Sequence, residues 1–461
     1  MIRIASVERY RENNRIEAKR ALGGFPHSIW ETYSAFANTL GGIILLGVEE
    51  HRDRSFHTVD LPDPEGFVEI FWRCVNDRSV VSANILTDDD VKIETVDGKR
   101  IVTITVPRAP RYLRPIYIGN DLKTGSYRRN GEGDYRCTPE ELGAMVRDAA
   151  AQTMDSLPVP SIDPVELCAP TLKRFRADFN AKRSGHAWCA LSDTDFLLRI
   201  GALCESDGML CPTNAGLLAF GRREAILSHY PHFSLALSAE CAFDGENLYD
   251  FYSLAKERLS DFLQTVTQDG EESTALRDAC MHALSNAILH ADYRVEGGVA
   301  VECTSRGITV SNPGDFRVDP SAAGEGGCSD PRNATLMRIF HTVRAAGRAG
   351  GGIPAILSLW QGAGFVTPVL TESFNPARVC LFLPFAKAQG RKTAPKGPGD
   401  ELHQKAMAID LLTDRITLTP DELAAALEIP QKSAKSLLQG LVLERIAVPE
   451  QGERDRFRLL S

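Results

Sequence analysis

The sequence lacks any apolar run long enough to span a bilayer, and its first residues, MIRIASVERYRENN, hold no signal-peptide core. Eleven cysteines are present, but none forms the CxxC spacing of a zinc ribbon, and scattered thiols are typical of a reducing compartment. No internal repeat and no P-loop sequence occurs. We therefore expect a cytoplasmic protein without a membrane partner, a disulfide framework or a Walker-type ATPase.

The chain has no excess of positive charge either, because its formal net charge is -9. Any nucleic-acid-binding surface must therefore be a local patch. With 461 residues, 43% of them hydrophobic, the chain is long enough for two to four globular domains. We predict an α+β multidomain protein with segments 1–155, 165–245, 246–386 and 401–461.

Charged side chains gather near the N-terminus. If RIEAK is a strand, Glu17 and Lys19 lie on one of its faces. A second predicted strand, Ile43–Val48, leads directly into Glu49 and Glu50. Carboxylates bind Mg²⁺ or Mn²⁺ through oxygen, and a lysine beside such a metal is a common nuclease arrangement. The alternative is that these charges are solvated side chains at strand ends.

The same residues resemble the AlbA-type domain of Schlafen proteins. The family pattern is similar to E12-NNRI-E17-A-K19, followed by A35-F-A-N-T-L-G-G42 and G47-V-E-E50. The resemblance implies a metal-dependent RNA-cleaving site that uses Mg²⁺ or Mn²⁺, with a tRNA-like substrate. Its catalytic residues would be Glu12, Glu17, Lys19, Glu49 and Glu50, and its metal ligands would include Glu12, Glu17 and either Glu49 or Glu50.

A basic and aromatic stretch, PRAPRYLRPIYI and KTGSYRRNGEGDYR, follows this region. Arginine pairs with phosphates and tyrosine stacks on unpaired bases, so the stretch favours binding of RNA or DNA. The alternative is a solvated loop face with its tyrosines in the core. The predicted nucleic-acid-binding residues here are Arg111, Arg114, Lys123, Tyr127, Arg128 and Arg129.

The segment ALSNAILHADYR predicts a helix with His282, Asn286 and His290 on one face. The two histidines would be roughly 12 Å apart along the axis, too far to share a metal ion. Glycine-rich loops follow at 311–316, 326–333 and 347–354. Such loops either cradle phosphate with backbone N–H groups or form tight turns around a sheet.

In order, these motifs resemble the GHKL ATP-binding domain, an α/β sandwich, in a divergent form that follows AlbA-type domains. The resemblance implies that Asn286 holds Mg²⁺ and that ATP is the ligand. His282 stands where hydrolysing members carry a glutamate, so binding without hydrolysis, or a scaffold that assembles a homo-oligomer, is expected. The implied nucleotide-binding residues are Asn286, His290, Asn312, Gly314, Gly350 and Gly352.

The C-terminal segment predicts two short helices, at about 420–427 and 431–443, and a hairpin, which is a winged-helix pattern. Thr419 and Glu422 form a capping box before the first helix. Lys432 and Lys435 would face outward and suit phosphate contact. Winged helices also bind proteins, so both roles stay open.

The sequence thus favours a nucleic-acid-binding protein with a Schlafen-like endoribonuclease site and a nucleotide-sensing module, suited to stress response or phage defence. The main alternative is a non-catalytic, ATP-binding transcriptional regulator that binds DNA. A third is a structural subunit of a larger defence complex.

Overall fold

The computed structural model describes residues 15–51, 56–131, 133–237, 245–266, 271–318, 329–345, 351–374 and 376–387, together with short stretches at 323–324 and 326–327 and parts of 408–459. It shows an α+β multidomain protein, as predicted. Two compact units are present: residues up to 149 with those from 399 onward, and residues 150–398.

The N-terminal region is built on a four-stranded sheet in the order β1-β2-β6-β5. Strand β1 runs parallel to β2, and the other pairs are antiparallel. Helices α1 and α2 pack against this sheet and bury Tyr33, Phe36 and Phe71 completely. The bounds are β1 (Ile16–Lys19), α1 (Ile29–Asn38), β2 (Gly42–Leu46), α2 (Pro64–Val75), β5 (Val91–Val96) and β6 (Lys99–Val106).

The predicted strand RIEAK is confirmed as β1, whereas the strand predicted at Ile43–Val48 is interrupted. Gly47 has a φ of +88°, and a Cβ there would meet Leu61 at 2.8 Å, so the chain turns at this glycine. Glu49 and Glu50 therefore belong to a separate strand, β3 (Val48–Glu50), which pairs with β4 (Phe56–Thr58). They do not form the end of β2.

Helix α1 is buried on nearly all sides, including its polar residues. Ser34 Oγ donates to the Ile116 carbonyl at 2.7 Å and accepts from the Tyr127 amide at 3.0 Å. Asn38 Nδ2 donates to the carbonyls of Ile116 and Tyr127, and Asn38 Oδ1 accepts from the Ile116 amide at 2.8 Å. These side chains satisfy backbone groups as a neighbouring strand would, which stabilises strand β7 (Tyr127–Asn130) beside α1.

Strand β7 forms a hairpin with β8 (Gly133–Arg136), and helices α3 (Leu122–Gly125) and α4 (Pro139–Ala149) flank this hairpin. At the start of α4, the Thr138 amide donates to Glu141 Oε2 and the Glu141 amide donates to Thr138 Oγ1. This capping box satisfies amide groups that the first helical turn leaves without an intrahelical acceptor.

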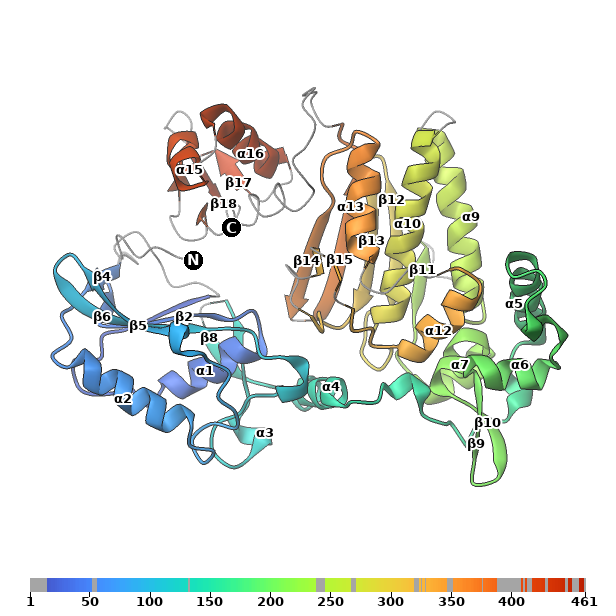
Figure 1. The fold of residues 1–461 in the computed structure, drawn as a ribbon, viewed down its shortest axis with the longest axis horizontal. Helices are drawn as coiled ribbons and strands as arrows, with labels where there is room; N and C mark the ends of the chain where they lie inside the picture. The colour runs from blue at the N-terminus through green and yellow to red at the C-terminus, as the bar shows by residue number, and fades with distance from the viewer. Residues whose placement is uncertain are drawn as a thin grey trace. The chain divides into compact units, whose positions relative to one another are not determined.

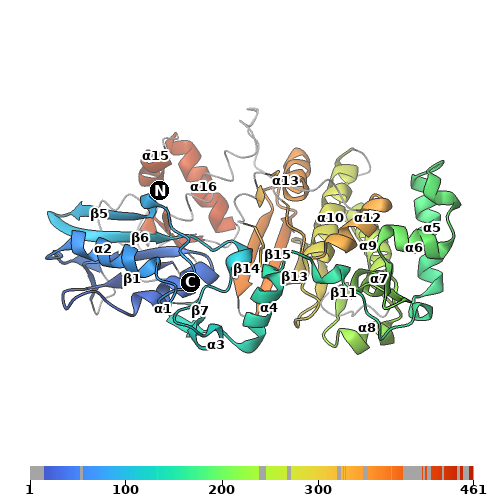
Figure 2. The same cartoon turned by 60° about the horizontal axis from the view of Figure 1, so that its bottom comes forward.

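The second unit contains a five-stranded sheet in the order β11-β12-β13-β15-β14. Helices α9, α10 and α13 lie on one face of this sheet (Figure 1), and α5 and α6 lie at the end of the unit farthest from β14 (Figure 2). The bounds are β11 (Leu235–Leu237), α9 (Leu248–Val266), α10 (Glu271–His290), β12 (Val299–Thr304), β13 (Gly307–Pro313), α12 (Ala334–Thr342), α13 (Gly352–Gly362), β14 (Val369–Phe374) and β15 (Ala377–Pro384).

Smaller elements precede this sheet. They are α5 (Ala169–Lys182), α6 (Asp193–Ile200), β9 (Leu203–Ser206), β10 (Met209–Pro212), α7 (Asn214–Phe220) and α8 (Arg223–His229). Their apolar side chains, such as Phe175 and Phe220, share one hydrophobic core with the sheet and its helices. The segment that precedes the sheet is therefore part of the same folded unit.

The C-terminal segment contains the two predicted helices, α15 (Pro420–Leu427) and α16 (Gln431–Leu443). Strands β16 (Thr417–Leu418), β18 (Phe457–Leu459) and β17 (Ala447–Pro449) form a small antiparallel sheet in that order. The predicted capping box is confirmed, because the Thr419 amide donates to Glu422 Oε2 and the Glu422 amide donates to Thr419 Oγ1.

Candidate functional site

A cavity opens in the second unit between helix α10 and the sheet. Its apolar wall comes from three strands, with Val310 on β13, Val379 and Leu381 on β15, and Leu370 on β14. Its polar side is α10, which contributes His282, Asn286 and His290 from successive turns. The three residues thus share the helix face that their spacing predicts.

A glycine allows close packing beside Asn286. Gly352 begins α13 and lines the cavity, and a Cβ at this position would meet Asn286 Nδ2 at 2.7 Å. Any larger residue at position 352 would push the amide of Asn286 aside. The predicted phosphate-side glycine is therefore in contact with the predicted magnesium-site asparagine.

The structure brings four of the six predicted nucleotide residues to this cavity: Asn286, His290, Asn312 and Gly352. Gly314 directly precedes the cavity-lining Asp315; its φ is +99°, and a Cβ at this position would meet Arg332 Nη1 at 2.6 Å, so glycine is favoured here. Gly350 lies outside the described residues.

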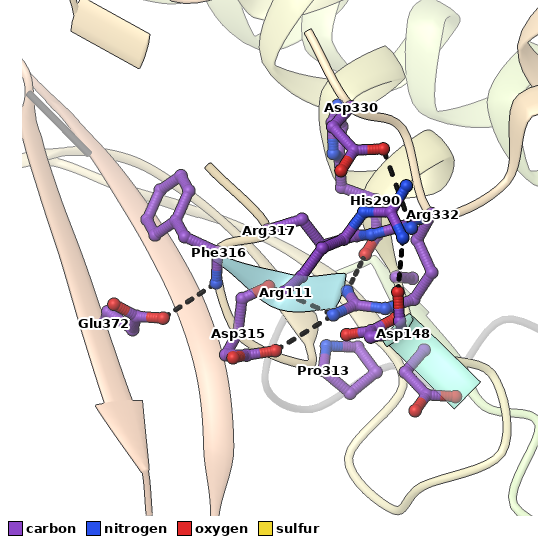
Figure 3. A network of polar contacts seen from close by, with 12 residues as sticks. Arg111, Asp148, His290, Pro313, Asp315, Phe316, Arg317, Asp330, Arg332 and Glu372 are labelled. Atoms are coloured by element: carbon purple, nitrogen blue, oxygen red, sulfur yellow. Dashed lines mark hydrogen bonds and ion pairs between the residues drawn. The ribbon is translucent and has the colours of Figure 1, made fainter. Parts of the chain in front are cut away.

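Paired charges surround His290 at one end of the cavity (Figure 3). Arg332 Nη1 donates to the His290 carbonyl at 2.6 Å, and Arg332 Nη2 donates to Asp315 Oδ1 at 3.0 Å. Arg317 Nη2 lies 3.6 Å from Asp330 Oδ1. Asp315, Arg317 and Asp330 all line the cavity. None of these three was selected from the sequence, although DFR directly follows the predicted SNPG loop.

Burial and the nearby guanidinium groups of Arg332 and Arg317 lower the pKa of His290 from 6.5 to about 4. His290 is therefore neutral at physiological pH, and its ring can serve as a hydrogen-bond donor and acceptor.

The second candidate site surrounds Glu17 on β1. Lys19 Nζ donates to Glu17 Oε1 at 3.0 Å, which confirms that the two side chains share a strand face. Arg129 Nη1 donates to Glu17 Oε2 at 3.0 Å and to Asp134 Oδ1 at 2.9 Å, and Thr32 Oγ1 donates to Asp134 Oδ2 at 2.7 Å. Both oxygens of Glu17 thus face cationic side chains.

In this arrangement the charge of Glu17 is balanced by Arg129 and Lys19. Within the described ranges, no group of three His, Cys, Asp or Glu residues lies close enough together to hold a metal ion. Glu49 lies 3.6 Å from Arg20 Nε, and Glu50 is exposed at the end of β3. Glu12, the other predicted ligand, lies outside the described residues.

Four of the predicted nucleic-acid-binding residues turn inward, contrary to the predicted surface role. Arg129 has a side chain only 2% exposed, and Arg114 is also buried. Tyr127 is buried with its hydroxyl donating to Glu31 Oε1, and Arg128 Nε lies 2.7 Å from Glu141 Oε1. In the structure Arg114, Tyr127 and Arg129 are thus buried, and Arg128 is half-buried beside Glu141.

Other members of the basic and aromatic stretch are accessible. Lys123 is exposed, and Arg111 is partly exposed while its Nη1 donates to the Asp148 carbonyl. Tyr112 is 67% exposed and Tyr135 is 54% exposed. On α16, Lys432 and Lys435 face outward, as predicted. The accessible surface thus still combines cations with aromatic rings.

Three regions of the chain match models of known protein families. Residues 12–138 match the family model described as "Schlafen, AlbA_2". The chain carries a Schlafen AlbA_2 domain. Residues 297–381 match the model described as "Putative ATP-dependent DNA helicase recG C-terminal", which makes this part a divergent ATPase-like module. Residues 143–236 match a domain of unknown function.

Two solved structures are similar to parts of the chain. A crystal structure of a protein from Corynebacterium diphtheriae is 16% identical and covers 96% of this chain and 79% of that one, with a TM-score of 0.41. A solution structure of the N-terminal domain of a RecG-related protein from Nitrosomonas europaea is 34% identical, with 27% and 84% coverage and a TM-score of 0.21. None of the curated proteins compared with the chain matches it.

Two accessible residues of the AlbA_2 domain, Tyr135 and Arg136 on β8, were not selected from the sequence. They pair across the hairpin with Arg128 and Tyr127, which take the inward positions. The signal for the hairpin was the turn-forming segment NGEG, which places two tyrosines in opposite strands. Across the described parts of the chain, no helix is both long and apolar enough to cross a membrane.

Proposed function

We propose that this protein binds nucleic acid through its AlbA_2 domain and binds a nucleotide in the cavity beside α10. The matches to the AlbA_2 and RecG-like family models support nucleic-acid binding. The observation that supports nucleotide binding is the convergence of Asn286, His290, Asn312 and Gly352 on one cavity. These residues come from three separate elements, so their convergence was not guaranteed by proximity along the chain.

The cavity suits a nucleotide with Mg²⁺ because it combines an apolar wall for a base with polar groups on α10. The amide oxygen of Asn286 would be a ligand for the Mg²⁺ that accompanies the phosphates. His282 lines the cavity, and the GHKL resemblance implies that hydrolysing members carry a water-activating glutamate at its position. We therefore propose binding of ATP or a related nucleotide without appreciable turnover.

A titration with a fluorescent nucleotide in the presence of Mg²⁺ tests this proposal. We expect saturable binding, weakened at least about tenfold in Asn286→Ala, since a contact to a charged ligand contributes about 1.5–3 kcal/mol. Asp278→Ala is the matched control, because Asp278 lies on the exposed side of the same helix. Equal affinity of both variants, or no binding by the wild type, would contradict the proposal.

The accessible aromatic residues of the AlbA_2 domain favour single-stranded or unpaired nucleic acid. Tyr112 and Tyr135 can each stack on a base, while Lys123 and Arg136 can contact phosphates. Fluorescence anisotropy with tRNA, single-stranded DNA and duplex DNA would measure the preference. We expect Tyr135→Ala to weaken tRNA binding about tenfold, because each stacked base contributes about 1–3 kcal/mol. Tyr135→Phe, which keeps the ring, serves as the matched control.

A second candidate function is Mg²⁺- or Mn²⁺-dependent RNA cleavage at Glu17, as part of stress response or phage defence. The family match and the contact between Glu17 and Lys19 favour it, whereas the Arg129 ion pair opposes it. To decide between RNA cleavage and binding alone, tRNA is incubated with the protein, with EDTA and Glu17→Gln as controls. Cleavage by the wild type that both controls abolish would support the nuclease.

The remaining alternative is a transcriptional regulator that binds promoter DNA through the C-terminal segment. The exposed Lys432 and Lys435 on α16 favour it. If Lys432→Gln with Lys435→Gln abolishes duplex DNA binding and leaves tRNA binding intact, the C-terminal segment is the DNA-binding element. If the double variant keeps both duplex DNA binding and tRNA binding, the AlbA_2 domain is the part that binds nucleic acid.

A further inference from the structure

Two cysteines face each other across the hairpin that β9 and β10 form. Cys204 on β9 is the direct register partner of Cys211 on β10, and their sulfur atoms lie 3.8 Å apart. The turn between the strands consists of Asp207 and Gly208, which both have a positive φ. Such a two-residue turn fixes the register of a hairpin. The pairing of the strands therefore holds the two thiols together.

The backbone of this pair meets the requirements of a disulfide bond. The Cα atoms of directly opposed residues in antiparallel strands are about 4.5–5.5 Å apart. Disulfides span Cα distances of about 4.4–6.8 Å, with the two sulfur atoms about 2.0 Å apart. Rotation of the Cys204 and Cys211 side chains is therefore sufficient to form the bond, and the strands can keep their register.

The two thiols differ in their access to solvent. Cys204 is half-buried, so a small oxidant can reach its sulfur, whereas Cys211 is only 2% exposed. Desolvation, and then the contact with Cys211, raise the pKa of the Cys204 thiol to about 11. Because the thiolate is the reactive form, oxidation of Cys204 is slow at neutral pH and becomes faster as the pH rises.

The other described cysteines are placed differently. Within the described parts of the chain, Cys204 and Cys211 are the only cysteines whose sulfur atoms are in contact with each other. Cys189, which is also half-buried, donates to the Arg183 carbonyl at 3.5 Å, and Cys280 is completely buried in the core. An oxidised Cys204 thus has one thiol beside it with which it can react.

We propose that Cys204 and Cys211 form a reversible disulfide when a peroxide reaches the hairpin. The Cys204 thiolate attacks one peroxide oxygen, so that an S–O bond forms, the O–O bond breaks and the other oxygen leaves as water after protonation. The Cys211 sulfur then displaces the oxygen from Cys204, which leaves as a second water molecule. The two thiols give up two electrons and two protons, peroxide takes up both, and a dithiol reductant reverses the reaction by exchange.

The disulfide would close the hairpin next to a base that is already fastened. Thr213, which follows β10, donates from its amide to the Ala202 carbonyl at 3.0 Å and from Oγ1 to the Gly201 carbonyl at 2.7 Å. A cross-link beside these bonds removes open conformations of the two strands, so we expect amide exchange in the hairpin to slow at least about tenfold. This inference is independent of the proposed nucleotide and nucleic-acid functions, and it assigns chemistry to the region that matches a domain of unknown function.

The experiment treats the full chain with hydrogen peroxide at about pH 9, where more of Cys204 is thiolate. The protein is then unfolded in urea with iodoacetamide, digested with trypsin and analysed by mass spectrometry. The tryptic peptide 200–222 contains both cysteines and no others. It also contains Met209, which is 61% exposed, so its sulfoxide shows that the oxidant has reached the hairpin.

Two variants accompany the wild type. Cys204→Ser should leave Cys211 free to react with iodoacetamide, whereas Cys189→Ser is the matched control and should keep the disulfide. If Cys204→Ser fails to fold, the peptide map of the wild type still decides, because it counts the alkylated cysteines directly. Hydrogen exchange of the oxidised and reduced wild type measures the change in the hairpin.

Each outcome decides the inference. It is supported if the wild-type peptide carries no alkyl group after peroxide and two after dithiothreitol, and if amide exchange in β9 and β10 slows at least about tenfold on oxidation. Two alkylated cysteines in a peptide whose Met209 is oxidised overturn it. A Cys204 that is linked to a different cysteine, or oxidised to a sulfinic acid while Cys211 stays free, overturns the pairing. Unchanged amide exchange in the oxidised protein overturns the assigned effect on the hairpin.

Discussion

Replacement of Arg129 by glutamine tests whether the Glu17 region is a structural ion network. Arg129 extends from β7 between Glu17 on β1 and Asp134 on β8, at 3.0 and 2.9 Å. Its guanidinium also lies 5.2 Å from the centre of the Phe36 ring. The substitution removes the only positive charge that contacts both carboxylates in this described network and keeps a polar side chain of similar length.

The expected loss of stability in Arg129→Gln follows from the burial of the two carboxylates. The side chains of Glu17 and Asp134 are 14% and 12% exposed, so neither carboxylate can recover much hydration when its partner is removed. Breaking a buried ion pair by removal of one partner costs about 3–5 kcal/mol, since the other charge stays buried. We expect a loss in this range at pH 7.

The assay is hydrogen exchange with mass spectrometry in increasing urea, which reports local unfolding of β1 and β7 separately from the other unit. Arg136→Gln is the matched control, since it removes an arginine from the neighbouring strand β8 that faces solvent. If Arg129→Gln lowers the free energy of unfolding by less than about 1 kcal/mol, the interpretation of this region as a structural ion network is refuted. Glu17 would then be free to act as a metal ligand, which would strengthen the nuclease candidate.

Three further predictions concern other parts of the chain. The pKa of His290 is about 6.5 in the unfolded chain and about 4 in the native protein. The free energy of unfolding should therefore fall by up to about 3 kcal/mol as the pH drops from 6.5 to 4. His290→Gln should flatten this part of the pH profile measured by urea unfolding. Gly352→Ala should displace Asn286 and weaken Mg²⁺–nucleotide binding about tenfold in a fluorescence titration without lowering the melting temperature; unchanged affinity would contradict the packing argument. Thr138→Ala should destabilise α4 by about 1 kcal/mol, measured by amide exchange of its first turn, and equal protection would mean that the capping box contributes nothing.

Elements that are defined by residues close together in the chain could be predicted well from the sequence. Strand β1, helix α10 and the capping boxes depend on residues within a few positions of each other, so periodicity and capping chemistry are sufficient to locate them. The strand predicted at Ile43–Val48 was wrong at its end because the apolar pattern continues through Gly47. The need for glycine at the turn arises from its close approach to Leu61, which is far along the chain.

Site residues were harder to predict because charge alone does not say which side of the chain a residue faces. In the segment YRRNGEGDYR, Tyr127 and Arg129 are buried, whereas Tyr135 and Arg136 are accessible. The difference arises from the packing of β7 against α1, which involves residues about ninety positions upstream. The His282, Asn286 and His290 face was predictable, but the charges at 315, 317 and 330 come from loops whose path no local pattern specifies.

The hydrogen bonds of Ser34 and Asn38 have a consequence for the order of events during synthesis. Their partners at Ile116 and Tyr127 lie 78 to 93 residues later in the chain. At about 5–20 residues per second, helix α1 is synthesised roughly 4 to 19 seconds before those partners exist. Any fragment that ends before position 116 leaves the side-chain amide of Asn38 without its backbone acceptors at Ile116 and Tyr127. The packing around α1 can therefore be completed only after Ile116 and Tyr127 have been synthesised, and until then the apolar face of this helix stays exposed on the nascent chain.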